Sequence, residues 1–326
     1  MNRMLCRVVA VAAGAVMVLL GGQHAVIGAP TDPAVGEAAG SEALGGRSVV
    51  PLRGAVPDWF TPALAAEVDD ADGHPVAAPA DAPLPGTVGI RPGSWMISPA
   101  GCTMNFVFAA SGSFGIGTAG HCVDRVGDEV VLLTLAPGTE NPVLVEIGTV
   151  VSRTVGPEDE IRPDFALVEI RPELNDWVSA TIGVIGGPCG QYGGEDAVPV
   201  VHYGHGLGIG TGGTPRAGLA LYYESDTYYF AGTAIFGDSG SPVRTADLPA
   251  IGNLTHILVD TSKPGATAAG TRIGTIQQLA GGWSLLDSPL CGGAGAGDGS
   301  GDGSGDGSGE DGGGGGDNPK RRGPKR

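Results

Sequence analysis

The stretch GTAIFGDSGSPV, residues 232–243, places Ser239 between an aspartate and a glycine, in a turn that ends on proline. Apolar residues such as Ile235 and Phe236 flank the turn, which a solvated linker would not need, and a plain hairpin would not need Asp238. A serine hydroxyl is a weak nucleophile at neutral pH, and it becomes reactive when a base accepts its proton and an acid orients that base. The turn therefore predicts that a histidine elsewhere in the chain is the base for Ser239 and that a carboxylate orients this histidine.

The best candidate for the base is His121, in the stretch GIGTAGHCV at residues 115–123. Histidine suits this role because its unperturbed pKa lies near 6.5. A disulfide at the next residue, Cys122, would fix the backbone beside the imidazole, and the small residues Ala119 and Gly120 leave space for the ring and for a substrate. Three further histidines lie in the central part of the chain: His202, His205 and His256.

The best candidate for the acid is Asp164, which stands at the start of an apolar strand in PDFALVEI, residues 163–170. A carboxylate at the edge of a buried strand is costly unless another group hydrogen-bonds it. An imidazole N–H would supply that hydrogen bond. The acidic neighbours Asp159 and Glu160 lie in a polar loop and are expected to be solvated.

The motifs TAGHC, DFALV and GDSGSP occur in that order, and together they resemble the chymotrypsin-like serine proteases, in particular their bacterial secreted branch. The chain order His, Asp, Ser differs from the orders in subtilisins and in α/β-hydrolases. The resemblance covers roughly residues 88–285 and leaves both ends of the chain outside it. It implies an all-β fold of two antiparallel β-barrels, with the active site in the cleft between them.

The resemblance also implies roles for individual residues. His121 and Asp164 would come from the first barrel and Ser239 from the second. The backbone N–H groups of Gly237 and Ser239 would form the oxyanion hole. No basic residue precedes the stretch GTVGIRPGS at residues 86–94, so activation through a new amino terminus is not expected; a buried arginine is the usual substitute, and the sequence does not single one out.

In the chymotrypsin-like proteases that the sequence resembles, the residue six before the nucleophile lies at the base of the specificity pocket. In this sequence that residue is Thr233. A buried lysine or arginine of the substrate would find no charge there, so we expect a preference for an uncharged, apolar side chain. His256 falls near the rim of the pocket and could favour an acidic side chain as the alternative preference. On its own, His256 is expected to face solvent.

The function that these motifs predict is a secreted serine endopeptidase that works through an acyl-enzyme intermediate and needs no cofactor and no metal. The alternatives are a catalytically silent protein of the same fold that binds a partner, and an esterase with the same acyl chemistry. His202 and His205, in the stretch VHYGHG at residues 201–206, have a spacing that suits a metal only on a helix. The glycines there indicate a loop.

The middle of the chain, residues 86–291, has the length and pattern of one all-β domain. Short β-type runs are separated by glycine and proline, and only residues 275–283 have weak helical character. The predicted strands are 102–110, 129–136, 143–151, 164–170, 197–203, 218–225 and 254–261. The formal net charge of −17 makes nucleic acid an improbable partner, so we expect a protein or peptide substrate and a monomer.

Five cysteines are present, and Cys6 would leave with a signal peptide. Four remain, an even number that suggests two disulfides in an exported chain, with three possible connectivities. Of these we choose Cys102–Cys122, which closes a short loop, and Cys189–Cys291, which ties the end of the domain back to its body.

The first 29 residues are predicted to be a signal peptide. Arg3 and Arg7 precede an apolar run at residues 8–20, and cleavage is plausible after Ala25 or Ala29. The run is short for a membrane span, so the alternative of an uncleaved anchor is disfavoured. We therefore expect an extracellular protein with no stable membrane insertion once the signal is removed.

Two further segments are predicted to lie outside the domain. Residues 30–85 are rich in alanine, proline and glycine and are interpreted as a propeptide or disordered linker, with one possible short helix at 56–68. Residues 292–326 form a Gly/Asp/Ser-rich tail with a basic end, which has nothing to bury and is expected to be disordered.

Overall fold

The computed structural model describes residues 48–206, 213–259 and 262–292. The predicted signal peptide and all but the first residue of the predicted tail lie outside these ranges. Within them, no helix is long and apolar enough to cross a membrane.

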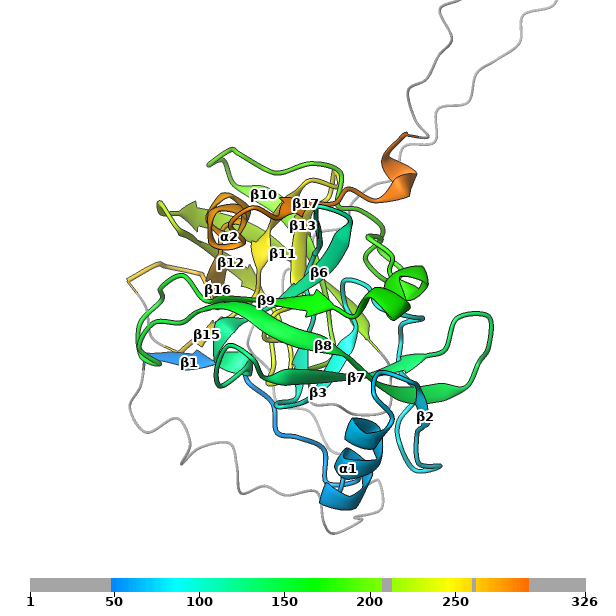
Figure 1. The fold of residues 1–326 in the computed structure, drawn as a ribbon. Helices are drawn as coiled ribbons and strands as arrows, with labels where there is room; N and C mark the ends of the chain where they lie inside the picture. The colour runs from blue at the N-terminus through cyan, green and yellow to red at the C-terminus, as the bar shows by residue number, and fades with distance from the viewer. Residues whose placement is uncertain (1–47, 207–212, 260–261, 293–326) are drawn as a thin grey trace, which may run out of the picture. The chain divides into compact units, whose positions relative to one another are not determined.

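Nine strands of the described chain form the first antiparallel sheet, in the order β17-β5-β6-β9-β8-β7-β3-β4 with β2 added beside β8 (Figure 1). Their bounds are β2 (Val76–Ala77), β3 (Trp95–Ser98), β4 (Cys102–Thr103), β5 (Val107–Ala110), β6 (Ser113–Thr118), β7 (Glu129–Leu135), β8 (Pro142–Thr154), β9 (Phe165–Ile170) and β17 (Ser284–Leu285). Two 3₁₀ helices belong to the same half: η1 (Gly120–Cys122) and η2 (Pro172–Trp177).

Eight strands of the described chain form the second antiparallel sheet, in the order β1-β15-β16-β12-β11-β10-β13-β14. Their bounds are β1 (Val49–Pro51), β10 (Val198–Gly204), β11 (Thr214–Tyr223), β12 (Thr227–Gly232), β13 (Pro242–Thr245), β14 (Ala250–Asn253), β15 (His256–Leu258) and β16 (Ala268–Thr271). Helix α2 (Ile273–Leu279) follows β16, and the 3₁₀ helix η4 (Pro289–Gly292) lies near the end of the described chain. The predicted all-β class with two antiparallel sheets is confirmed.

Each sheet encloses its own apolar cluster, and a third cluster joins the two halves. The joining cluster contains Phe106, Phe108 and Phe165 from the first half, together with Tyr203 and Ile276 from the second half. Burial of such large side chains stabilises a fold by about 1.5–3 kcal/mol each. The two sheets are therefore held together by packing, and the residues at their junction have fixed positions.

The predicted strands at 129–136, 143–151 and 164–170 correspond to β7, β8 and β9, and those at 197–203 and 218–225 to β10 and β11. The predicted strand at 102–110 is divided into β4 and β5. The predicted strand at 254–261 contributes only the short β15. Sequence patterns did not reveal β6, whose sequence SFGIGT contains two glycines. A Cβ at one of them, Gly117, would lie 2.1 Å from the Asn105 side chain, so packing requires the residue that weakens the strand pattern.

The structure differs from the predicted domain start at residue 86, because residues 48–85 pack onto both sheets. β1 pairs with β15, and α1 (Pro62–Asp70) packs against the first sheet (Figure 1). Thr61 caps α1 by accepting a hydrogen bond from the Leu64 N–H at 3.3 Å, and buried Val68 packs in a cluster with Trp95. The composition of this segment suggested disorder, but its apolar residues Leu52, Phe60 and Val68 are buried in the clusters of the domain. Its processing as a propeptide stays a prediction.

The four cysteines of the described chain are joined in the chosen pairs, Cys102 with Cys122 and Cys189 with Cys291. The first disulfide ties β4 to η1, the 3₁₀ helix that carries His121. The second joins residues 102 apart in the sequence. In the chain-entropy model, closing a loop of this length stabilises the fold by about 4–5 kcal/mol.

Candidate active site

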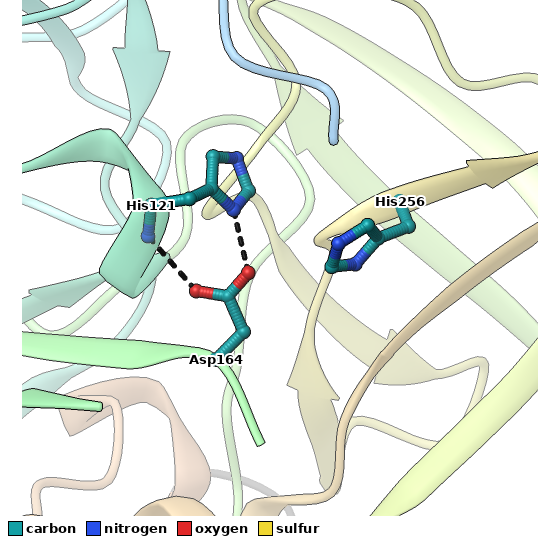
Figure 2. Close-up of side chains that lie close together, drawn as sticks. All are labelled: His121, Asp164 and His256. Carbon is teal, nitrogen blue, oxygen red and sulfur yellow. Dashed lines mark hydrogen bonds and ion pairs between the residues drawn. The ribbon is translucent and has the colours of Figure 1, made fainter. Parts of the chain in front are cut away.

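His121 and Asp164 meet through two hydrogen bonds. The His121 ring Nδ1 lies 2.5 Å from Asp164 Oδ2, and the His121 backbone N–H donates to Asp164 Oδ1 at 3.0 Å (Figure 2). His121 stands on η1, after β6, and Asp164 stands at the start of β9, which pairs with β6. Gly120 permits this approach, because a Cβ there would lie 2.0 Å from the Thr154 carbonyl oxygen. One carboxylate oxygen therefore orients the imidazole, and the other holds the backbone that carries it.

Asp164 is buried and is anchored from the other sheet. Its backbone N–H donates to Thr271 Oγ1 at 2.9 Å, and its carbonyl accepts from Asn253 Nδ2 at 2.9 Å. Burial by itself would raise the pKa of Asp164, but the charge of His121 and the hydrogen bonds from it outweigh burial and hold that pKa below its usual range. Asp164 is therefore a carboxylate at neutral pH, in the ionisation state that an orienting acid requires.

Ser239 is the third member of a row of hydrogen-bonded side chains, after Asp164 and His121. Its Oγ lies 2.6 Å from His121 Nε2 and 3.3 Å from the Thr255 carbonyl oxygen. The serine turn needs glycine on both sides, since Gly237 has φ of +97° and Gly240 has φ of +88°. The structure thus brings together the three residues that the sequence motifs predicted as a set.

Thr103 of the first sheet holds the serine turn in place. Its N–H donates to the Ser239 carbonyl at 2.8 Å, and its Oγ1 donates to the Gly237 carbonyl at 2.9 Å. The adjacent residue Cys102 is bonded to Cys122, next to His121. The disulfide and Thr103 together fix the distance between the imidazole and the hydroxyl, and sequence reasoning identified only the disulfide.

Asp238 is fully buried beneath the turn and pairs with Arg216. Arg216 Nη1 lies 2.6 Å from Asp238 Oδ1 and 2.7 Å from Oδ2. The backbone N–H groups of Gly206 and Ile235 also donate to this carboxylate, at 2.8 and 3.0 Å. The arginine that the sequence left unassigned is therefore Arg216, whose side chain is 15 % exposed.

The two predicted oxyanion donors have different partners. The Gly237 N–H donates to the Leu52 carbonyl oxygen at 2.7 Å. The Ser239 N–H donates to no protein acceptor within the described ranges. Both donors belong to the turn that carries Ser239, and a carbonyl group of this chain already lies at the first of them.

The prediction that His256 faces solvent is wrong, because only 3 % of the residue is exposed. Its ring lies 5.7 Å from that of His121, and its Nδ1 lies 2.8 Å from Thr255 Oγ1 (Figure 2). Desolvation by burial lowers its pKa to about 4. His256 is thus a neutral group beside the row of Asp164, His121 and Ser239, and an acidic side chain of a bound peptide would find no positive charge on it at neutral pH.

His121, Asp164 and His256 also place one ligand atom each within 4.8 Å of one another, a spacing that a metal ion could use. The hydrogen bonds of these residues argue against a metal site. Both nitrogens of His121 are engaged, one with Asp164 and the other with Ser239, and His256 Nδ1 is engaged with Thr255. A metal bound to His121 would have to displace either Asp164 or Ser239 from a ring nitrogen.

Thr233 is exposed, and its carbonyl lies 2.9 Å from His202 Nε2. Its neighbour Ala234, rather than Thr233, packs against the apolar cluster of the second sheet. His202 lies in β10, not in a loop, and His205 follows that strand. His205 stacks on Trp95 with ring centroids 5.6 Å apart. The sequence identified neither of these positions as buried core.

Acid is expected to destabilise the protein through its buried neutral histidines. Desolvation by burial lowers the pKa of His205 to about 4, whereas in the unfolded chain it is near 6.5. Between these values the unfolded chain binds the proton and the folded protein does not, so stability falls as pH drops through this window. From pH 7 to pH 5, His205 and His256 should each remove about 2 kcal/mol.

Urea unfolding at pH 7 and pH 5 measures this loss, and His205→Phe keeps an aromatic ring against Trp95 without a titrating group. The variant should lose about 2 kcal/mol less than the wild type over the same interval. An equal loss in both proteins would show that His205 is not buried as a neutral ring.

No family model and no curated protein matches the chain. Solved structures with a similar fold include protease A of Thermobifida fusca, at 18 % identity and a TM-score of 0.40, over 61 % of this chain and 97 % of that one. A glutamic acid specific serine protease that utilises a histidine triad in substrate binding aligns at 13 % identity and a TM-score of 0.44, over 60 % of this chain and 100 % of that one. An alpha-lytic protease homolog aligns at 15 % identity and a TM-score of 0.42, over 61 % and 100 %.

Proposed function

We propose that the chain is a serine endopeptidase, with Ser239 as nucleophile, His121 as general base and acid, and Asp164 as the orienting carboxylate. The observation that carries the proposal is the continuous row of hydrogen bonds from Asp164 Oδ2 through His121 to Ser239 Oγ, at 2.5 and 2.6 Å. A nucleophile and base within hydrogen-bond reach, with the base oriented by a third group, is the arrangement that acyl transfer requires.

In the proposed reaction, Ser239 Oγ attacks the carbonyl carbon of a peptide bond as His121 Nε2 takes its proton. Asp164 keeps the other ring nitrogen protonated and stabilises the imidazolium that forms. The Gly237 and Ser239 N–H groups stabilise the negative charge on the substrate oxygen. His121 then returns the proton to the leaving amine, and a water molecule hydrolyses the serine ester.

We further propose that the enzyme acts outside the cell on peptides with an uncharged, apolar residue before the cleaved bond. The two disulfides support an oxidising compartment. The apolar cluster of the second sheet, which includes Phe230, Val243 and Leu254, supports the apolar preference. The signal peptide and the monomeric state stay predictions from the sequence.

Cleavage of a peptide library by the wild type and by Ser239→Ala tests the proposal. The wild type should hydrolyse internal peptide bonds, preferring Leu, Phe or Ala before the bond over Lys or Arg, and the variant should not. Hydrolysis of esters but of no amide would identify an esterase instead. A kcat/KM for Lys or Arg more than tenfold above the apolar residues would contradict the expected preference.

A further inference from the structure

Residues 48–58 of this chain run through the candidate active site from the second sheet to the first. On the second sheet, β1 adds as an edge strand to β15, with Val50 opposite Ile257 and Pro51 opposite His256. The Val259 N–H donates to the Ser48 carbonyl at 2.9 Å, which continues the ladder. An extended segment that pairs with a sheet edge in this way is how an enzyme holds a peptide in a defined register.

Leu52 follows directly and lies at the serine. Its N–H donates to the Thr255 carbonyl at 3.0 Å, and that same carbonyl accepts from Ser239 Oγ at 3.3 Å. Its own carbonyl oxygen accepts from the Gly237 N–H at 2.7 Å, at one of the two groups assigned above to the oxyanion. One residue is therefore tied on its amino side to an oxygen that contacts the nucleophile, and on its carbonyl side to the oxyanion donor.

The Leu52 side chain is fully buried in the apolar cluster of the second sheet. The buried members of that cluster include Phe230, Val243 and Leu254, and Ala234 and Ile257 pack against it. The site thus holds the uncharged, apolar side chain of Leu52, and this is the class of side chain that the sequence predicted for a substrate.

After Leu52 the segment crosses to the first sheet. Gly54 and Gly101 exchange two backbone hydrogen bonds, at 2.8 and 3.1 Å. Between them and Leu52, the Arg53 guanidinium donates to the His121 carbonyl at 3.0 Å and pairs with Asp124 at 3.3 Å. The Leu52–Arg53 peptide bond is therefore held from both sides: the Leu52 carbonyl is bound at Gly237, two residues before Ser239, and the Arg53 side chain is bound at the backbone of His121.

We propose that the Leu52–Arg53 bond is a processing site that Ser239 of the same chain cleaves. The inference rests on the proposed function. Ser239 Oγ bonds to the Leu52 carbonyl carbon while its proton passes to His121. The C–N bond then breaks and His121 protonates the Arg53 nitrogen. Water hydrolyses the Leu52 ester, so one water molecule is consumed, and a Leu52 carboxylate and an Arg53 amine are formed.

Cleavage opens the site to other substrates. The strand that ends at Leu52 is then held by non-covalent contacts alone, to β15, Thr255, Gly237 and the apolar cluster of the second sheet, and it can leave as a product. The chain from Arg53 onward stays attached through Gly54, Gly101 and α1. Before cleavage the segment blocks the oxyanion donor, so the full chain should be inactive on added peptides until the bond is cut.

N-terminal sequencing and intact mass of the purified full chain test the proposal over a time course. The wild type should acquire Arg53 as a new amino terminus, at a first-order rate that stays constant over a hundredfold dilution. Ser239→Ala should keep the bond intact. A rate proportional to protein concentration, or cleavage at a different bond, would overturn the proposal.

Substitutions at Leu52 test the register. Leu52→Asp should slow cleavage at least tenfold, because a carboxylate enters an apolar site, whereas Leu52→Met conserves volume and should cleave at close to the wild-type rate. Leu84→Asp is the matched control, since Leu84 is 64 % exposed, and it should leave cleavage unchanged. If Leu52→Asp fails to fold, Leu52→Met against Leu52→Gly at equal melting temperature provides the same comparison.

An added fluorogenic peptide separates this proposal from the proposed function. Hydrolysis of that peptide that depends on Ser239, with the Leu52–Arg53 bond still intact, would overturn the processing site and leave the peptidase standing. Hydrolysis of neither substrate would overturn both. With processing as proposed, activity on the peptide should rise in step with the appearance of the Arg53 terminus.

Discussion

Ser239→Ala and His121→Ala are each expected to lower kcat for peptide hydrolysis by a factor of about 10⁴–10⁶, and Asp164→Asn by about 10⁴. Ser239→Ala removes the attacking oxygen. His121→Ala removes the ring nitrogen that lies 2.6 Å from Ser239 Oγ and accepts its proton. Asn at position 164 keeps the shape of the side chain but loses the charge that stabilises the imidazolium. Steady-state kinetics on a matched chromogenic peptide, with circular dichroism to verify folding, measure the effect.

The three side chains are expected to act as a unit, so the Ser239→Ala/His121→Ala double variant should be little worse than either single variant. The exposed residues Ser225 and His74 offer matched controls, and Ser225→Ala and His74→Ala should keep wild-type kcat. More than a few per cent of wild-type turnover in folded Ser239→Ala would be incompatible with the assigned nucleophile.

Arg216→Met is expected to destabilise the protein by about 3–5 kcal/mol and to reduce kcat as well. It leaves Asp238, which is fully buried, with a charge that, among the described residues, is contacted by the backbone N–H groups of Gly206 and Ile235. The same carboxylate holds the turn from Ile235 to Ser239, so loss of the ion pair should loosen the oxyanion donors. Urea unfolding and kinetics on the same preparation measure both effects.

Arg162→Met is the matched control, because Arg162 also pairs with a carboxylate, that of Glu160 at 2.9 Å, but its side chain is 64 % exposed. An exposed pair contributes about 0–1 kcal/mol, so this variant should change stability little. Equal stability of Arg216→Met and the wild type would mean that Asp238 does not depend on its ion pair.

The row of Asp164, His121 and Ser239 could be predicted from the sequence, because each member stands in a short, distinctive motif whose residues are neighbours in the chain. The role of Arg216 could not be predicted, because nothing in its local sequence distinguishes it from other arginines. It reaches Asp238 through the pairing of strands β10 and β11. His256 was expected to face solvent, because its own stretch of sequence does not show which strands cover it. Its burial arises from β16 on one side and β1 on the other.

The segment that carries Leu52 was the largest difference between sequence and structure. Its alanine, proline and glycine content favours a linker, and β1 is only three residues long, so no periodic pattern marks it. Its position is set by backbone hydrogen bonds to Thr255, Gly237 and Gly101, which a sequence pattern does not encode. Contacts of that kind can be identified only from the folded arrangement of the two sheets.

The central claim is that Ser239 is an activated nucleophile, and covalent labelling with a fluorophosphonate tests it most directly. Tandem mass spectrometry of the labelled wild-type protein should locate one adduct, on Ser239, and His121→Ala should label at least a hundredfold more slowly. An adduct on a different residue, an absence of labelling on Ser239, or equal labelling of the wild type and His121→Ala would contradict the account.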